Sequence, residues 1–101
     1  MKRAELQDYP DGAQVLLYDC PGCGMLHAVG IKGEGRPLWT WNGSLEAPTL
    51  TPSVLVTWNW GEANTPHRCH SFVRDGYAEI LSDSTNEHAG KTLPIPPWSD
   101  A

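Results

Sequence analysis

The sequence predicts a small all-β domain built mainly from antiparallel hairpins, with little or no helix. Three observations support this fold class. Nine prolines and ten glycines in 101 residues interrupt almost every stretch long enough to form a helix. Short runs of β-branched and aromatic residues recur between turn signals such as Asn42-Gly43. The length allows one domain, which we expect to span 1–101, with a polar lead-in at 1–13 and a flexible tail at 96–101.

Each expected strand is a short apolar or alternating run bounded by turns, and the runs are 15–18, 25–31, 38–41, 54–60, 69–73, 77–81 and 91–95. The first two runs are expected to form one hairpin, and the fifth and sixth runs a second. Prolines at positions 48 and 52 make 47–53 a sheet edge or a covering arm, because proline cannot donate a ladder hydrogen bond. The stretch 82–90 is polar and turn-like.

Charge and hydropathy disfavour two classes of partner. The formal net charge is −5 and the basic residues are scattered, whereas a nucleic-acid-binding surface concentrates them in a stripe. No apolar run approaches the ~20 residues of a membrane span. Because 1–10 lack the apolar core of a signal peptide, we expect a cytoplasmic protein. We expect no membrane partner, and the charge disfavours a nucleic-acid partner.

A Cys-Pro-Gly-Cys knuckle between the first two strands carries the most chemical information. Cys20 and Cys23 can converge on one tetrahedral ion only if the backbone turns tightly between them, which the intervening proline and glycine allow. Cys69 starts the second hairpin and is the natural third ligand. The sequence therefore predicts one structural zinc in a zinc-ribbon-like β domain. A redox pair, a bound iron or three unrelated buried thiols are the alternatives.

The fourth ligand must be a histidine, because the chain has only three cysteines. The candidates are His27, His67, His70 and His88, and spacing alone does not choose among them. On an extended strand Cys69 and His70 point to opposite faces, which favours His67 unless a bulge intervenes.

Four stretches resemble a small phage and prophage family of unknown function. They are 20–24 with His27, 48–53, 69–73 with Gly76, and 88–92. Members of that family sometimes carry the label ammonia monooxygenase, which fits poorly with a thiolate-rich site and no membrane segment. The resemblance implies a phage protein in the host cytoplasm. It also makes His70 the expected fourth ligand, beside Cys20, Cys23 and Cys69, because the Cys-His pair belongs to the motif. Where a further cysteine would be expected before His88, this chain has Ser84.

No complete catalytic set emerges from the sequence. A closed site of three cysteines and one histidine leaves no open metal position, and Ser71 and Ser84 lack the context of a nucleophile elbow. We therefore expect a non-enzymatic, zinc-stapled module that binds a host or phage protein, with Trp60 and Trp98 as candidate contact residues and self-association as a further option. A zinc-dependent hydrolytic enzyme is the alternative, and a nucleic-acid-binding zinc ribbon is third.

Overall fold

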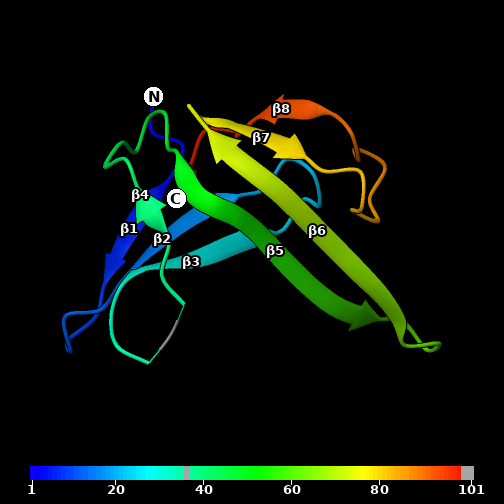
Figure 1. Cartoon of the computed structure of the whole chain (residues 1–101), viewed down its shortest axis with the longest axis horizontal. Helices are drawn as coiled ribbons and strands as arrows, with labels where there is room; N and C mark the ends of the chain where they lie inside the picture. Colours follow the sequence, from blue (N-terminus) through cyan, green and yellow to red (C-terminus); the bar gives the residue numbers. More distant parts are fainter. Residues whose placement is uncertain (36, 99–101) are drawn as a thin grey trace.

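The structure, a computed structural model, describes residues 1–35 and 37–98 as two antiparallel sheets, with no helix in that part of the chain (Figure 1). The strands are β1 (Glu5–Asp8), β2 (Gln14–Asp19), β3 (Leu26–Lys32), β4 (Thr40–Trp41), β5 (Leu50–Trp60), β6 (Thr65–Arg74), β7 (Tyr77–Ile80) and β8 (Thr92–Pro94). Strands β1 to β3 form one sheet in sequence order, and β4 to β8 form the other. The predicted all-β class and both predicted hairpins are confirmed.

The first sheet includes a strand that the sequence analysis assigned to a polar lead-in. Within 1–13, β1 pairs antiparallel with β2, with Leu6 opposite Leu16. Ala4 is fully buried just before this strand, and Arg3 donates a backbone hydrogen bond to the carbonyl of Leu45. The lead-in is polar because β1 is an edge strand with one solvated face, and polarity alone did not reveal the pairing.

The second sheet is dominated by the long hairpin of β5 and β6, which extends beyond the rest of the molecule in Figure 1. Both strands begin about four residues earlier than the sequence predicted, because their prolines lie where no ladder hydrogen bond is lost. Pro52 lies within a register shift between Leu50 and Val54, and Pro66 lies on a stretch of β6 that β7 does not reach.

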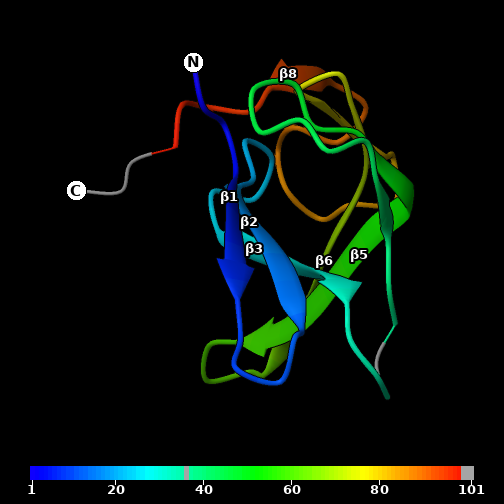
Figure 2. The same ribbon diagram turned by 90° about the vertical axis from the view of Figure 1, so that its left-hand side faces the viewer.

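The core lies between the sheets. Leu16, Tyr18 and Val29 come from the first sheet, and Val54 and Ile80 come from the second. Figure 2 shows the three-stranded sheet beside the β5–β6 hairpin. Burying each large side chain of this kind stabilises the fold by about 1.5–3 kcal/mol, so a core of this size benefits from an additional crosslink.

Most of the tryptophans pack against this core. Trp39, Trp41 and Trp58 pack against it while remaining partly exposed, whereas Trp60 near the hairpin tip is 73% exposed. Trp98 donates its backbone N–H to the carbonyl of Lys2, so the start of the predicted flexible tail rests on the N-terminal segment. Residues 99–101 of that tail lie outside the described residues.

Within the described residues, no helix is long and apolar enough to cross a membrane.

Candidate active site and metal centre

Strand β6 separates two sites because adjacent residues of a strand face opposite sides. Cys69, Ser71 and Val73 face the core and are fully buried. His70 faces the other side of the sheet, and its side chain is 24% exposed. One strand therefore supplies a cysteine to an inner cluster and a histidine to an outer one.

The inner cluster contains three cysteines and one histidine. Potential ligand atoms of Cys20, Cys23, His27 and Cys69 all lie within 4.8 Å of one another. The sulfurs of Cys20 and Cys69 are 3.7 Å apart, and the Cys23 sulfur is 3.2 Å from Nε2 of His27. A tetrahedral zinc with Zn–S bonds of about 2.3 Å separates two sulfur ligands by about 3.8 Å, so this group could hold a metal ion.

The local backbone explains why these side chains converge. The N–H of Cys20 donates to the carbonyl of Met25, and the N–H of Gly24 donates to the carbonyl of Cys20, which closes the knuckle. Gly24 has a positive φ of 74°, a conformation that glycine adopts without steric cost. His27 then lies on the inward face of β3, where Nδ1 is 3.1 Å from the Tyr18 hydroxyl and Nε2 is left for the cluster.

The thiols of the cluster perturb one another strongly. Hydrogen bonds from Cys20 and Cys69 lower the pKa of the Cys23 thiol to about 3, and hydrogen bonding with Cys20 and Cys23 raises the pKa of Cys69. Repulsion between like charges prevents three neighbouring thiols from all ionising in one cluster unless a cation balances the negative charge. The cluster is thus chemically suited to a divalent metal ion.

His70 is not part of this cluster, although the sequence analysis placed it there. The fourth side chain is His27, which the bend at Gly24 returns to the cysteines. His67 stacks on Trp58 with the ring centroids 5.4 Å apart, and Nδ1 of His88 is 3.0 Å from the carbonyl oxygen of Gly22. The three cysteines do meet as predicted, with a different histidine.

The outer cluster joins His70 to a serine and an aspartate. Nε2 of His70 is 2.9 Å from Oγ of Ser53, and Nδ1 is 3.0 Å from Oδ2 and 3.2 Å from Oδ1 of Asp83. The hydrogen bond from His70 holds the pKa of the Asp83 carboxyl below its ordinary value. A hydroxyl, an imidazole and a carboxylate in this order form the constellation of a serine nucleophile with its general base.

A family model described as the serine protease of a bacterial ubiquitination-like system, BubE, matches residues 2–81. The chain belongs to the BubE family. Neither the curated proteins nor the solved structures contain a match to it.

Membership of the BubE family overturns two expectations from the sequence. The match extends over the motifs around the knuckle, 48–53 and 69–73, so the resemblance to a phage and prophage family of unknown function was wrong. The expectation of a non-enzymatic module that binds a host or phage protein was also wrong, because the family is described as a serine protease. The hydrolytic alternative is closer to that description.

A bulge in β5 places the serine of this BubE-family chain. Leu50 pairs with Val73 and Val54 pairs with Ser71, so three residues of β5 lie opposite one residue of β6. Ser53 is the last of these three, and extra residues in one strand re-aim side chains beside a site.

The loop at 82–90 places the aspartate and fixes the histidine. The N–H of His70 donates to Oγ of Ser84 over 2.9 Å, and the Ser84 hydroxyl donates to the carbonyl of His70 over 3.0 Å. The amide of Asn86 contacts the Cys69 sulfur at 3.8 Å, and His88 reaches the knuckle at Gly22. The loop that carries Asp83 therefore contacts both the inner cluster and the knuckle.

Ser71 and Ser84, the two serines weighed in the sequence analysis, lie outside the outer cluster. Ser71 is fully buried on the inner face, and its hydroxyl has no hydrogen-bond partner in the described part of the chain. The Ser84 hydroxyl is hydrogen-bonded to the backbone of His70. Sequence reasoning missed Ser53 and Asp83. The sequence did contain one signal: on a strand, His70 points to the opposite face from Cys69. That direction favours contacts of His70 with side chains outside the cysteine cluster.

Proposed function

We propose that this chain is a serine protease that acts in a bacterial ubiquitination-like system, with Ser53 as nucleophile, His70 as general base and Asp83 as the group that orients the imidazole. The observation that carries the proposal is the unbroken contact from Oγ of Ser53 through both ring nitrogens of His70 to the Asp83 carboxylate. The description of the BubE family supports it independently.

The geometry defines the roles of the three side chains. As Oγ of Ser53 bonds to the scissile carbonyl carbon, Nε2 of His70 takes the hydroxyl proton. When the carbon–nitrogen bond breaks, that proton passes from Nε2 to the leaving amine, and Ser53 carries the acyl group. A water molecule then gives one proton to Nε2 and its hydroxide to the acyl carbon. When the bond between that carbon and Oγ breaks, Nε2 returns the proton to Oγ, and both Ser53 and His70 are restored.

Asp83 keeps the imidazole in the required tautomer. Its lowered pKa keeps the carboxyl ionised, so Nδ1 of His70 carries a proton and Nε2 remains free to accept one. The Arg68 guanidinium, 3.8 Å from Oδ2 of Asp83, adds a weaker stabilisation of the same charge at an exposed position.

The metal is proposed to be zinc, held by Cys20, Cys23, His27 and Cys69. Thiolate and imidazole ligands are those that tetrahedral structural zinc takes, and four protein donors leave no position for a substrate. The bound ion supplies folding energy and charge balance, and the chain's own residues perform the reaction. A closed site of this kind favours the serine route over a zinc-dependent hydrolytic mechanism.

Cleavage of the ubiquitin-like protein of the source bacterium, offered as precursor and as conjugate, tests this function. We expect the wild-type chain to release a defined product and Ser53→Ala to lose at least 1,000-fold in kcat/KM, because removal of the nucleophile leaves only the residual catalysis of a triad enzyme, about 10³–10⁴ over water. Ser82→Ala is the matched control, because this serine is exposed in the same loop as Asp83.

Equal cleavage rates for Ser53→Ala and the wild-type chain would remove Ser53 from the mechanism. Circular dichroism and metal content of each purified variant separate a lost reaction from a lost fold.

A further inference from the structure

Beyond Thr51, one edge of β5 has no strand beside it among residues 1–35 and 37–98. Strand β4 pairs with β5 only at Leu50 and Thr51, and in the described part of the chain no strand continues that pairing toward Trp60. Figure 1 shows this stretch of β5 forming the border of the long hairpin. An exposed strand edge presents unpaired N–H and C=O groups, which are a template for another extended chain.

Hydrogen bonds on the far side of β6 show which β5 groups point to the free edge. His70 uses its N–H and C=O on Ser84 and Leu81, and therefore directs them away from β5. In an antiparallel pair, residues opposite each other direct their backbone groups either both inward or both outward. Because Leu55 is opposite His70, its N–H and C=O face the free edge.

The backbone groups of Thr57 and Asn59, two and four residues further along β5, also face the free edge. Arg68 bonds to Thr85 through both its N–H and its C=O, and Thr57 is opposite Arg68. Pro66, which has no N–H, is opposite Asn59. The free edge therefore offers donor and acceptor pairs at every second residue, in the spacing that an extended peptide requires.

Ser53, the proposed nucleophile, lies where the free edge of β5 ends and other segments begin to cover the strand. Ser53 is two residues before Leu55 and on the same face of the strand. Its carbonyl oxygen already accepts a hydrogen bond from Nε1 of Trp39 over 3.2 Å, so the segment around Trp39 covers the edge at this point. A peptide laid along β5 thus reaches the hydroxyl of Ser53 where the free edge ends.

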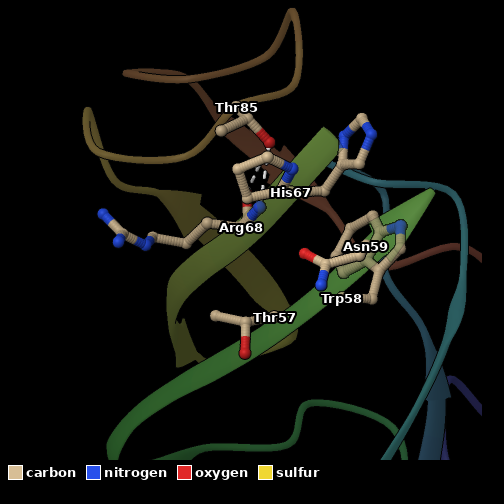
Figure 3. Close-up of a pocket in the computed structure, with 7 residues that line it drawn as sticks. Thr57, Trp58, Asn59, His67, Arg68 and Thr85 are labelled. Atoms are coloured by element: carbon tan, nitrogen blue, oxygen red, sulfur yellow. Dashed lines mark hydrogen bonds between the residues drawn. The ribbon is translucent and has the colours of Figure 1, made fainter. Parts of the chain in front are cut away.

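A hollow of about 480 Å³ lies further along the same two strands. Figure 3 shows its lining, to which Thr57 and Asn59 contribute from β5, Arg68 and His67 from β6, and Thr85 from the loop after β7. The hollow gives space for side chains of a peptide whose main chain follows the edge.

We propose that the polypeptide to be cleaved binds as an added strand on the free edge of β5, with its main chain hydrogen-bonded to Leu55 and Thr57 and its scissile carbonyl at Oγ of Ser53. This inference rests on the proposed protease function. The occupant is an extended, locally unfolded segment of a protein substrate, because the free edge matches the main chain of a polypeptide and the proposed protease reaction at Ser53 needs an amide carbonyl of that chain. Main-chain recognition selects an extended conformation more than a particular sequence.

Two serine-directed reagents separate this inference from the protease proposal. The first is the diphenyl phosphonate of acetyl-trialanine, which carries a peptide main chain, and the second is a small alkyl fluorophosphonate, which carries none. Amide hydrogen exchange is followed by NMR before and after modification. We expect the peptide reagent to slow exchange at Leu55 and Thr57 at least tenfold, with little change at Val56, whose N–H faces β6. The fluorophosphonate should produce no such alternation.

Any other pattern of labelling and exchange contradicts either the protease proposal or the docking proposal. If neither reagent modifies Ser53 in the folded chain, the protease proposal fails and the docking proposal fails with it. If both modify Ser53 and exchange at Leu55 and Thr57 is the same with each, only the docking proposal fails. Slow exchange at these amides before any reagent is added, together with a dimeric mass in solution, would assign the edge to a second copy of the chain.

A backbone substitution provides the second test. Thr57→Pro removes an N–H that points away from β6, and proline is tolerated on an edge strand in that orientation. We expect the labelling rate by the peptide phosphonate, divided by the rate by the fluorophosphonate, to fall at least fivefold in Thr57→Pro and clearly less in Thr57→Ala. An equal ratio in wild type, Thr57→Pro and Thr57→Ala would contradict main-chain docking at this residue.

Discussion

At the scale of single residues, Cys69 and His70 show why a sequence motif can hide two functions. The residues are adjacent, so the pair reads as one metal motif, yet the alternation of β6 sends the sulfur into the core and the imidazole to the surface. The three cysteines could be predicted to meet. Which histidine joins them depends on how tightly the chain bends between Cys23 and His27, and neither motif nor spacing determines that bend.

The two histidines should respond oppositely to substitution. His27→Ala removes a donor from the cysteine cluster and should weaken metal binding at least tenfold in a competition with a chromogenic chelator. His70→Ala should bind metal like the wild-type chain and lose peptidase activity. Weaker metal binding by His70→Ala than by His27→Ala would restore His70 as the ligand and exclude it from a triad.

Asp83 provides a second prediction at this scale. Asp83→Asn keeps the size of the side chain but removes the charge that fixes the tautomer of His70, and in a Ser-His-Asp triad of known mechanism this change lowers kcat by about 10⁴. We expect kcat/KM to fall by at least 100-fold, measured on the cleavage assay. Activity within threefold of the wild-type value would show that Asp83 is only a surface neighbour.

At the scale of elements, the loop at 82–90 links the two sites. It contributes Asp83 to the proposed triad, a hydroxyl of Ser84 that bonds to the backbone of His70, and an amide of Asn86 that contacts the sulfur of Cys69. The sequence identified this stretch only as polar and turn-like. The loop contacts residues of β6 that lie about 14 to 17 positions earlier in the chain. No local sequence pattern predicts contacts between residues so far apart.

Ser84 tests this link. Ser84→Ala deletes both hydrogen bonds between its hydroxyl and His70, which should destabilise the fold by about 1–3 kcal/mol because the backbone groups of His70 lose a partner. Since these two bonds also hold the backbone of His70 against the loop that carries Asp83, we expect kcat to fall about tenfold with KM within twofold. Urea denaturation and steady-state kinetics measure the two effects. A loss of stability with unchanged kcat would limit Ser84 to a structural role.

At the scale of the whole molecule, the cluster of three cysteines and His27 connects the two sheets. The knuckle with Cys20 and Cys23 follows β2, His27 belongs to β3, and Cys69 comes from β6 of the second sheet. The fold class and the meeting of the cysteines were readable from composition and spacing. The contacts among Ser53, His70 and Asp83 were not, because they require the bulge at Ser53, the register of β5 against β6 and the path of the 82–90 loop at once.

Removal of the metal should therefore affect both stability and activity. Structural zinc sites contribute about 10–16 kcal/mol of apparent binding free energy at neutral pH, more than a core of this size can replace. We expect Cys20→Ser, or prolonged treatment with a strong chelator, to lower the melting temperature by more than 15 °C and to abolish cleavage. A metal-free chain with native dichroism and full activity would contradict the structural role.

The proposal that His70 activates Ser53 is tested most directly by mass-spectrometric mapping of a fluorophosphonate adduct on the intact, metal-loaded chain. We expect a single adduct on the peptide that contains Ser53, formed rapidly in the wild-type chain and at least 100-fold more slowly in His70→Ala. An adduct confined to another serine, or equal labelling of Ser53 with and without the imidazole of His70, would show that these residues do not form a catalytic unit.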